Sequence, residues 1–252
     1  MKKLILLLSA ILTLIFSTQI TAQEKDQLWY CWEETVKPEK IDDYLAFSKE
    51  FLDLCKSKNF PFPVFTWQAK PFTYELWSPI NSLNDIEILN TAWKDLSEKL
   101  GEEKFKAFQG TKLHNRSYTC TIKNELSYHP ENPEYGRNEL MYARWIELYI
   151  EDGKQKEYEN AQKWMMEQRA KHDFGCWVFV ATGDLGFEAP CYIVMAGHKS
   201  REELDKAMEN SNEKMKGEWD EFMSRIRPLM RKPNKYYDWH LLPELSYWKD
   251  SE

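Results

Sequence analysis

The amino-acid sequence predicts an α+β fold in which two units of the order β-α-β-β-α-β pack against each other sheet to sheet. The stretch YTCTIKNELSY, from Tyr118, agrees with YDWHLLPELSY, from Tyr237, at five of eleven positions. Upstream, matching residues recur at one offset of 114: Lys40 and Lys154, Tyr44 and Tyr158, Lys49 and Lys163, Val64 and Val178, Phe65 and Phe179. Strand-like and helix-like segments also follow the same order in both halves. Together these observations predict two diverged copies of one unit of roughly 110 residues.

The first 22 residues have the pattern of an export signal. Met1, Lys2 and Lys3 form a positively charged start, residues 4–16 an apolar core, and residues 17–22 a polar stretch that ends at a small residue. This apolar core is too short to span a bilayer as a helix. We therefore expect cleavage after residue 22, export to the periplasm or the extracellular space, and no membrane attachment afterwards.

The first unit is predicted to occupy residues 23–128. Its expected elements are a strand at 28–34, a helix at 38–58, strands at 64–69 and 73–78, helices from 82 and from 102 to 112, and a strand at 118–124. The first helix follows from apolar residues spaced three or four apart, at Ile41, Tyr44, Leu45, Phe51, Leu52 and Cys55. Ser82 with Asp85 has the pattern of a capping box, and Gly101 interrupts the helical run that follows.

The second unit, residues 139–252, is predicted to have the same plan. Its expected elements are a strand at 140–150, a helix at 153–172, strands at 176–182 and 191–197, helices from 200 and from 218 to 231, and a strand at 236–242. Ser200 with Glu203 repeats the capping pattern, and Gly217 repeats the break. Residues 129–138 (HPENPEYGRN) contain two prolines and a glycine among polar residues, which predicts a linker between the units.

The composition excludes some partners and favours others. Without Lys2 and Lys3, 32 basic residues face 41 acidic ones, a net charge of −9, which disfavours nucleic acid and anionic lipid as partners. The chain contains 11 Trp, 13 Tyr and 13 Phe. These rings are either a core of large side chains or, in part, the lining of a cavity for a flat or apolar ligand.

Five cysteines in an exported chain leave at least one thiol unpaired. Cys31 and Cys120 fall on strands expected to be neighbours, as do Cys176 and Cys191, so bridging stays open. A chain of this size does not need disulfides, and buried free thiols are the expected state.

The β-α-β-β-α-β order is that of a ferredoxin-like unit, whose sheet has one face without helices. Two such units in one chain can bury those faces together, and at residues 27–247 the chain resembles the dimeric α+β barrel superfamily in a tandem form. That superfamily includes cofactor-independent monooxygenases, small isomerases and lactonases, NIPSNAP-like proteins and the haem-binding chlorite dismutase group. The resemblance implies a ligand site in the cavity between the sheets and leaves the reaction open.

A candidate polar cluster comes from alternation along the closing strand. Tyr237 and Trp239 lie on one face of this strand, and Asp238 and His240 lie on the other. If the aromatic face lies under the helices, the polar face points into the barrel, near Arg144 on the neighbouring strand. Asp238 could then orient His240 as a base and Arg144 could bind an anionic oxygen. The alternative is a structural ion pair between neighbouring strands.

Trp32, Trp67 and Trp145 are the candidate ligand-binding rings. No His or Cys spacing is typical of a metal site, and no nucleophile elbow, phosphate loop or dinucleotide fingerprint occurs. No cofactor is predicted, although His172 or His240 could serve as a single axial haem ligand.

Three functions remain after these exclusions. The first is an exported protein that binds a small apolar or aromatic molecule in an aromatic cavity. The second is a cofactor-independent enzyme, monooxygenase-like or isomerase-like, that uses His240, Asp238 and Arg144. The third is a haem-binding protein.

Overall fold

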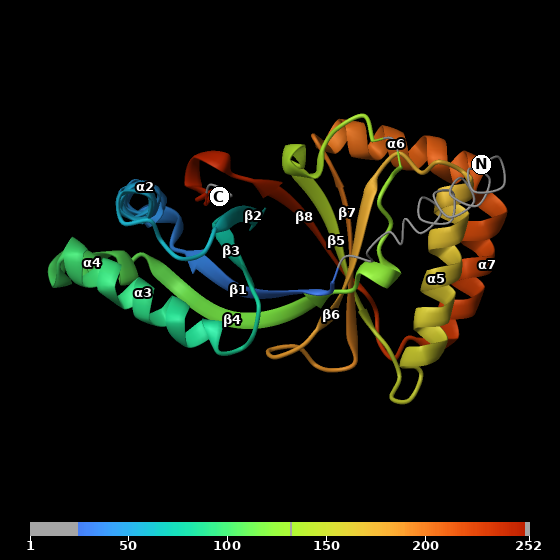
Figure 1. Cartoon of the computed structure of the whole chain (residues 1–252), viewed down its shortest axis with the longest axis horizontal. Coiled ribbons are helices and arrows are strands. Elements are labelled where there is room, and N and C mark those ends of the chain that lie inside the picture. Colours follow the sequence, from blue (N-terminus) through green and yellow to red (C-terminus); the bar gives the residue numbers. More distant parts are fainter. Residues whose placement is uncertain (1–24, 132, 250–252) are drawn as a thin grey trace, which may run out of the picture.

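The computed structural model describes residues 25–131 and 133–249, so the predicted export signal lies outside the described residues. In this part of the chain, eight antiparallel strands form one closed barrel in the order β1-β3-β2-β8-β5-β7-β6-β4. Helices lie outside the barrel in two groups, at opposite ends of the molecule (Figure 1). The predicted fold class, an α+β barrel formed within one chain, is confirmed.

The two halves have the same order of elements. The first half contains β1 (Gln27–Val36), α2 (Ile41–Ser57), β2 (Phe65–Lys70), β3 (Thr73–Ile80), α3 (Asp85–Leu100), α4 (Glu102–Gln109) and β4 (Lys112–Ile122). The second half contains β5 (Tyr142–Tyr149), α5 (Gln155–Lys171), β6 (Trp177–Gly183), β7 (Cys191–His198), α6 (Arg201–Lys214), α7 (Lys216–Ile226) and β8 (Lys235–Leu241). Within the described residues, each half therefore supplies four strands to the barrel and three α-helices outside it.

Several local boundaries differ from the sequence prediction. Strand β4 begins at Lys112, six residues earlier than expected, because α4 ends at Gln109 and the chain turns at once into the sheet. Gly217 lies inside α7, and the break between α6 and α7 falls at Met215. Ser200 caps α6 as predicted, since its side chain accepts a hydrogen bond from the Glu203 backbone N–H. The Ser82 side chain makes no such bond at the start of α3.

Strand pairing across the two halves closes the barrel. The first half forms the order β4-β1-β3-β2 and the second half β8-β5-β7-β6. Pairing of β2 with β8 and of β4 with β6 joins them, through Trp67 opposite Leu241 and Cys120 opposite Gly183. Closure removes the unpaired strand edges that two separate sheets would expose.

Large aromatic side chains fill the middle of the barrel. The indole rings of Trp145 and Trp239 stack at 4.4 Å between centroids, and Trp77 meets both edge to face at 5.3 and 5.2 Å. All three residues are buried, and they come from β3, β5 and β8, so this layer joins the two halves. Below we call these three residues the tryptophan layer.

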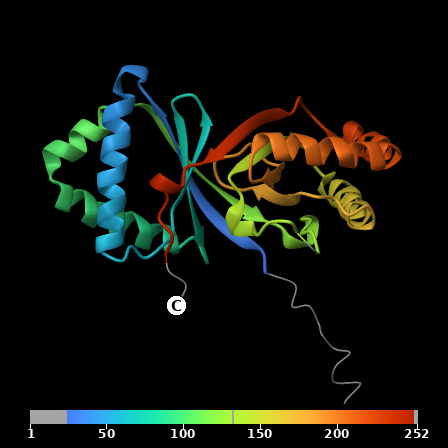
Figure 2. The same ribbon diagram turned by 90° about the horizontal axis from the view of Figure 1, so that it is seen from above.

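The helices cover the outer face of each half-sheet. Helices α2 and α3 pack on the first half through Leu52, Cys55, Leu89 and Leu96, and α5, α6 and α7 pack on the second half through Tyr158, Met165, Leu204 and Phe222. Figure 2 shows the strands between these two helical groups. The inner faces of both half-sheets are therefore covered, and their outer faces are covered where the helices pack. Tyr236 and His240, on the outer face of β8, are exposed. None of the described helices is both long enough and apolar enough to cross a membrane.

All five cysteines are buried free thiols, as expected. Cys31 and Cys120 lie in the barrel interior, and Cys176 and Cys191 are buried in the second half. Burial raises the pKa of Cys176 and of Cys191 to about 12, so both thiols keep their protons near neutral pH.

Replacing a ring of the tryptophan layer should destabilise the whole fold. Trp239→Ala leaves a cavity among fully buried rings and is expected to lower the free energy of unfolding by about 3–5 kcal/mol. Tyr236→Ala, on the same strand but 64% exposed, should change it by less than about 0.5 kcal/mol. Urea unfolding followed by far-ultraviolet circular dichroism measures both. Equal effects of the two substitutions would contradict the assignment of Trp239 to the core.

Candidate functional site

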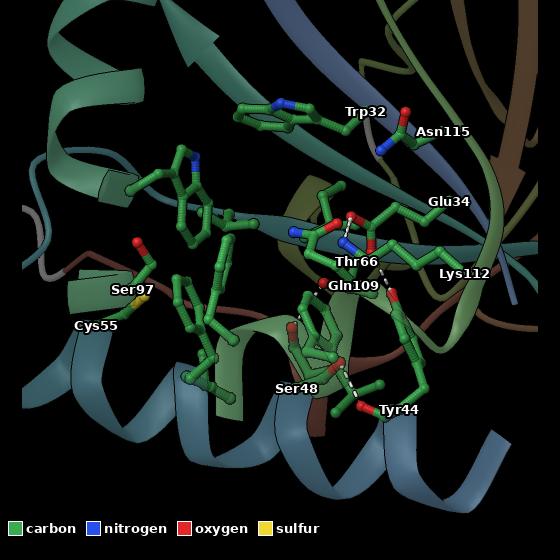
Figure 3. Close-up of a pocket in the computed structure, with 18 of the residues that line it drawn as sticks. Trp32, Glu34, Tyr44, Ser48, Cys55, Thr66, Ser97, Gln109, Lys112 and Asn115 are labelled. Atoms are coloured by element: carbon green, nitrogen blue, oxygen red, sulfur yellow. Dashed lines mark hydrogen bonds and ion pairs between the residues drawn. The ribbon is translucent and has the colours of Figure 1, made fainter. Parts of the chain in front are cut away.

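A cavity of about 430 Å³ lies between the outer face of the first half-sheet and its helices. We call it the helix-side cavity. Its walls come from β1, β2, β3 and β4 on one side and from α2, α3 and α4 on the other, with residues after β8 at one edge. The lining residues used below are Trp32, Glu34, Tyr44, Ser48, Phe51, Cys55, Thr66, Trp93, Phe108, Gln109, Lys112 and Asn115 (Figure 3).

Aromatic rings form most of the cavity wall. Phe51 of α2 stacks on Trp93 of α3 at 4.8 Å between centroids, and Trp32 of β1 meets Trp93 edge to face at 5.8 Å. Phe108 of α4 stacks on Tyr44 of α2 at 5.4 Å. These rings come from four separate elements, which hold them in fixed relative positions. Such a wall suits a flat, largely apolar molecule.

Polar groups converge at one side of the same cavity. Glu34 on β1 forms an ion pair with Lys112 on β4, and it accepts a hydrogen bond of 2.8 Å from the Tyr44 hydroxyl. The side chains of Lys112 and Glu34 are only 7% and 14% exposed. Burial and the neighbouring Glu34 charge raise the pKa of Tyr44, so its phenol stays a hydrogen-bond donor. Gln109 and Asn115 lie close to this pair (Figure 3).

Two further lining groups have distinct chemical states. The indole Nε1 of Trp93 is buried and has no hydrogen-bond partner among the described residues. A buried donor without a partner is costly to the fold. Burial raises the pKa of the Cys55 thiol to about 12, so Cys55 is a neutral wall residue rather than a nucleophile.

The corresponding positions of the second half carry apolar side chains. The offset of 114 that relates Tyr44 to Tyr158 pairs Glu34 with Leu148 and Thr66 with Val180. Leu148 and Val180 are buried in a packed cluster with Tyr158 beneath α5. The first half thus has polar groups and open space where the second half has aliphatic core. This difference is the main reason to regard the helix-side cavity as a site.

Arg144 and Asp238, two of the three residues of the predicted polar cluster, lie together, but they do not point into the barrel as expected. Arg144 forms ion pairs with Asp238, at 3.2 Å, and with Asp205 of α6, at 3.0 Å. These residues therefore lie on the outer face of the barrel beside α6, and His240 is exposed on the same face of β8. The aromatic face of β8, with Trp239, points inward instead. Packing explains this orientation, because the Trp239 indole is buried against Trp77 and Trp145 between the two half-sheets.

The three candidate tryptophans lie in different places. Trp32 lines the helix-side cavity, whereas Trp67 lines a second cavity of about 320 Å³ inside one end of the barrel. Trp145 belongs to the tryptophan layer and lines a third, smaller cavity at the other end of the barrel. The cavity expected between the sheets is therefore divided in two by the tryptophan layer.

Sequence reasoning missed the polar groups of the helix-side cavity. Glu34, Tyr44 and Lys112 are far apart in the sequence and match no motif. One available signal was the sequence offset of 114 between the halves, which aligns Glu34 with Leu148 and Thr66 with Val180. Where one half has a charged residue and the other half has an aliphatic residue at the aligned position, the charged residue has a role other than packing in the hydrophobic core.

The residues at the cavity do not fit a haem site. An axial ligand is usually a His, a Cys thiolate, a Met or a Tyr. His172 lies within hydrogen-bond distance of Glu218, and His240 lies on the outer face of the barrel, so neither candidate lines the cavity. Cys55 keeps its proton, and Tyr44 is bound to Glu34. In residues 25–131 and 133–249, no group of three or more His, Cys, Asp or Glu side chains could hold a metal ion.

Comparison with known proteins identifies the fold. No family model matches the chain, and no curated protein matches it. The chain is similar to the structure of an anthrone oxidase-like protein, with 13% identity and a TM-score of 0.58, over 91% of this chain and 96% of that one. A protein from Lactobacillus acidophilus NCFM that is provisionally assigned as a monooxygenase gives 8% identity and a TM-score of 0.55, over 89% and 97%.

A third similar structure is a variant of chlorite dismutase from Candidatus Nitrospira defluvii, with 10% identity and a TM-score of 0.50, over 90% of this chain and 96% of that one. At these identities the likeness shows the fold alone. The closed barrel and the three likenesses confirm the resemblance to the ferredoxin-like, dimeric α+β barrel fold.

The ion pair between Lys112 and Glu34 should matter for stability because it is nearly buried. Lys112→Met leaves the Glu34 carboxylate without its cation and is expected to lower the free energy of unfolding by about 3–5 kcal/mol. The double variant Glu34→Leu with Lys112→Met should recover most of that loss. Lys163→Met, which breaks the exposed pair with Glu125, is the control and should cost less than about 1 kcal/mol. If Lys112→Met costs no more than this control, the pair is not a buried one.

Proposed function

We propose that this protein binds a small, flat, largely apolar molecule with one polar group in the helix-side cavity. The main support for this proposal is the difference between the halves. Glu34 and Thr66 line a cavity in the first half, whereas the aligned Leu148 and Val180 lie in a packed core in the second half. A cavity that arose only from imperfect packing would have apolar walls and would lack an ion pair such as that of Glu34 with Lys112. A nearly buried ion pair beside empty, ring-lined space is typical of a binding site.

The chemistry of the wall indicates the class of ligand. Trp32, Phe51 and Trp93 offer ring faces and edges for an aromatic molecule. At the polar side, Glu34 accepts hydrogen bonds, so a phenol or enol hydroxyl is the matching group. The ligand class is therefore a hydroxylated aromatic compound.

The wider setting forms part of the same proposal. The charged and apolar pattern of residues 1–22 supports export, so that the ligand would be met outside the cytoplasm. The matched positions at an offset of 114 support two diverged copies of one unit, of which the first kept a site. The net charge of −9 after signal removal favours a neutral small molecule over an anionic polymer.

Blocking the cavity should abolish binding without unfolding the protein. A thermal-shift screen of hydroxylated aromatic compounds should yield ligands that, at 100 times their dissociation constant, stabilise the fold by about 2.7 kcal/mol. Ser48→Trp fills the helix-side cavity and should remove that stabilisation. Leu140→Trp fills the cavity lined by Trp67 and should leave the stabilisation by the ligand unchanged. A ligand whose effect survives Ser48→Trp and disappears in Leu140→Trp would place the site inside the barrel.

A second candidate function is oxidation of the bound molecule without a resident cofactor. Two observations favour it: the likeness to proteins named as a monooxygenase and as anthrone oxidase-like, and the Glu34 carboxylate at the cavity wall. A carboxylate in hydrogen-bond reach can accept a proton from a phenol or an activated C–H group. The resulting electron-rich anion is the form of such molecules that reacts with dioxygen. Lys112 and Tyr44 would hold the carboxylate in position.

Glu34→Gln separates binding from this chemistry. The amide keeps the shape of the carboxyl group but cannot serve as a base, so turnover should fall by about 10²–10⁴-fold. The ligand affinity should change by no more than a few-fold. An oxygen electrode measures uptake, and calorimetry measures affinity. If no compound that binds supports oxygen uptake by the wild-type protein, the oxidase function is excluded for those compounds and binding remains.

A further inference from the structure

Helix α4 forms one wall of the helix-side cavity without burying any of its own side chains. It lies at the outer end of the first half (Figure 1), and its residues Phe105, Phe108 and Gln109 line the cavity. The two rings are half-buried, and the other side chains of the helix are exposed. A short helix gains most of its stability from packing, so α4 can leave its place at low cost.

The helix at the same place in the second half is packed more firmly. Phe222 and Ile226 of α7 are only 5% and 2% exposed, and they belong to the hydrophobic core of that half. The two helices follow α3 and α6 in the same order of elements. The loose packing of α4 is therefore a feature of the half that has the cavity and not of the fold.

Glycines stand at both ends of α4. Gly101 joins α3 directly to α4 with φ 91° and ψ 144°, a backbone conformation that is nearly restricted to glycine. A Cβ placed on Gly101 would meet no atom within 4 Å, so the space around this joint is open. Gly110 follows α4, and the next residue, Thr111, is fixed to the sheet because its carbonyl oxygen accepts a hydrogen bond of 2.9 Å from the Lys37 backbone N–H. One helix thus lies between two pivots.

A few contacts hold α4 against α2. The Phe108 ring stacks on the Phe47 ring at 4.0 Å between centroids and on the Tyr44 ring at 5.4 Å. Lys104 forms an ion pair with Glu50 of α2, and both of these side chains are about half exposed. Exposed ion pairs contribute little to stability. The position of α4 therefore depends mainly on the one ring of Phe108.

We propose that α4 is a lid, which opens at Gly101 and Gly110 to admit a ligand to the helix-side cavity and then closes over it. This inference rests on the function proposed for that cavity. When α4 opens, Phe108 and Gln109 leave the cavity wall and a flat molecule can enter beside α2. When α4 closes, Phe108 contacts the bound molecule, so the ligand favours the closed state.

Amide hydrogen exchange of the ligand-free protein tests the motion itself. The backbone amides of residues 105–109 should exchange at least about tenfold faster than those of residues 222–226 in α7, because the lid opens locally. Equal protection of the two helices would overturn the proposal. A cross-link between α2 and α4 should slow the exchange of residues 105–109. Glu50→Cys with Lys104→Cys allows it, because a short bismaleimide can join the two introduced thiols while the five native cysteines are buried.

Rates of ligand exchange test the lid as a gate. The probe is 2-naphthol, a small hydroxylated aromatic compound whose fluorescence in stopped-flow mixing gives the association and dissociation rate constants. Lys104→Ala removes the ion pair that helps to close α4, so both rate constants should rise by the same factor, up to about fivefold, and the dissociation constant should stay unchanged. Lys163→Ala breaks the similarly exposed pair with Glu125 and should change neither rate constant.

The cross-linked protein should show the opposite effect. Both rate constants for 2-naphthol should fall by the same factor, at least about tenfold, relative to the same double variant without the cross-link. If 2-naphthol binds and its rate constants respond neither to the cross-link nor to Lys104→Ala, α4 is not the gate, although the cavity keeps its proposed function. If 2-naphthol does not bind, the proposed function fails for this compound, and the exchange rates of α4 and α7 decide whether α4 is a lid.

Discussion

The packing of large rings inside the closed barrel is the interaction on which the rest of this structure depends. Each half-sheet has one face without helices, and neither half can bury that face alone. Trp77, Trp145 and Trp239 meet in the middle and tie β3 to β5 and β8. This layer also separates two cavities of the interior, one at each end of the barrel. The resemblance had led us to expect the ligand site in that space.

Because side chains fill much of the barrel interior, the two halves differ in cavity space mainly at the outer faces of their sheets. In the second half, Leu148 and Val180 pack under α5 and complete a core. In the first half, Glu34 and Thr66 stand at the matching positions, and the space beneath α2, α3 and α4 stays open. The second half is thus packed with aliphatic side chains where the first half has polar groups and a cavity. The same division explains why a nearly buried ion pair is tolerated at Glu34.

The fold followed from the sequence because it depends on periodicity, matched positions and element order, which are local or repeated properties. The site did not, for two physical reasons. Alternation along β8 separates two faces but does not show which of them points into the barrel. Arg144 and Asp238 were therefore placed in the barrel although they pair beside α6. Glu34 can be recognised as a site residue only from its contacts with Tyr44 and Lys112, and the tertiary fold brings these residues together.

The central claim is that a ligand occupies the helix-side cavity of the first half, and the indole N–H signals of the protein test it most directly. The side chains of Trp32 and Trp93 line that cavity, whereas those of Trp145 and Trp239 lie in the barrel interior. Two-dimensional ¹⁵N NMR during titration with a hydroxylated aromatic ligand should shift the first pair of indole signals and leave the second pair in place. Shifts confined to Trp145 and Trp239 would contradict this account.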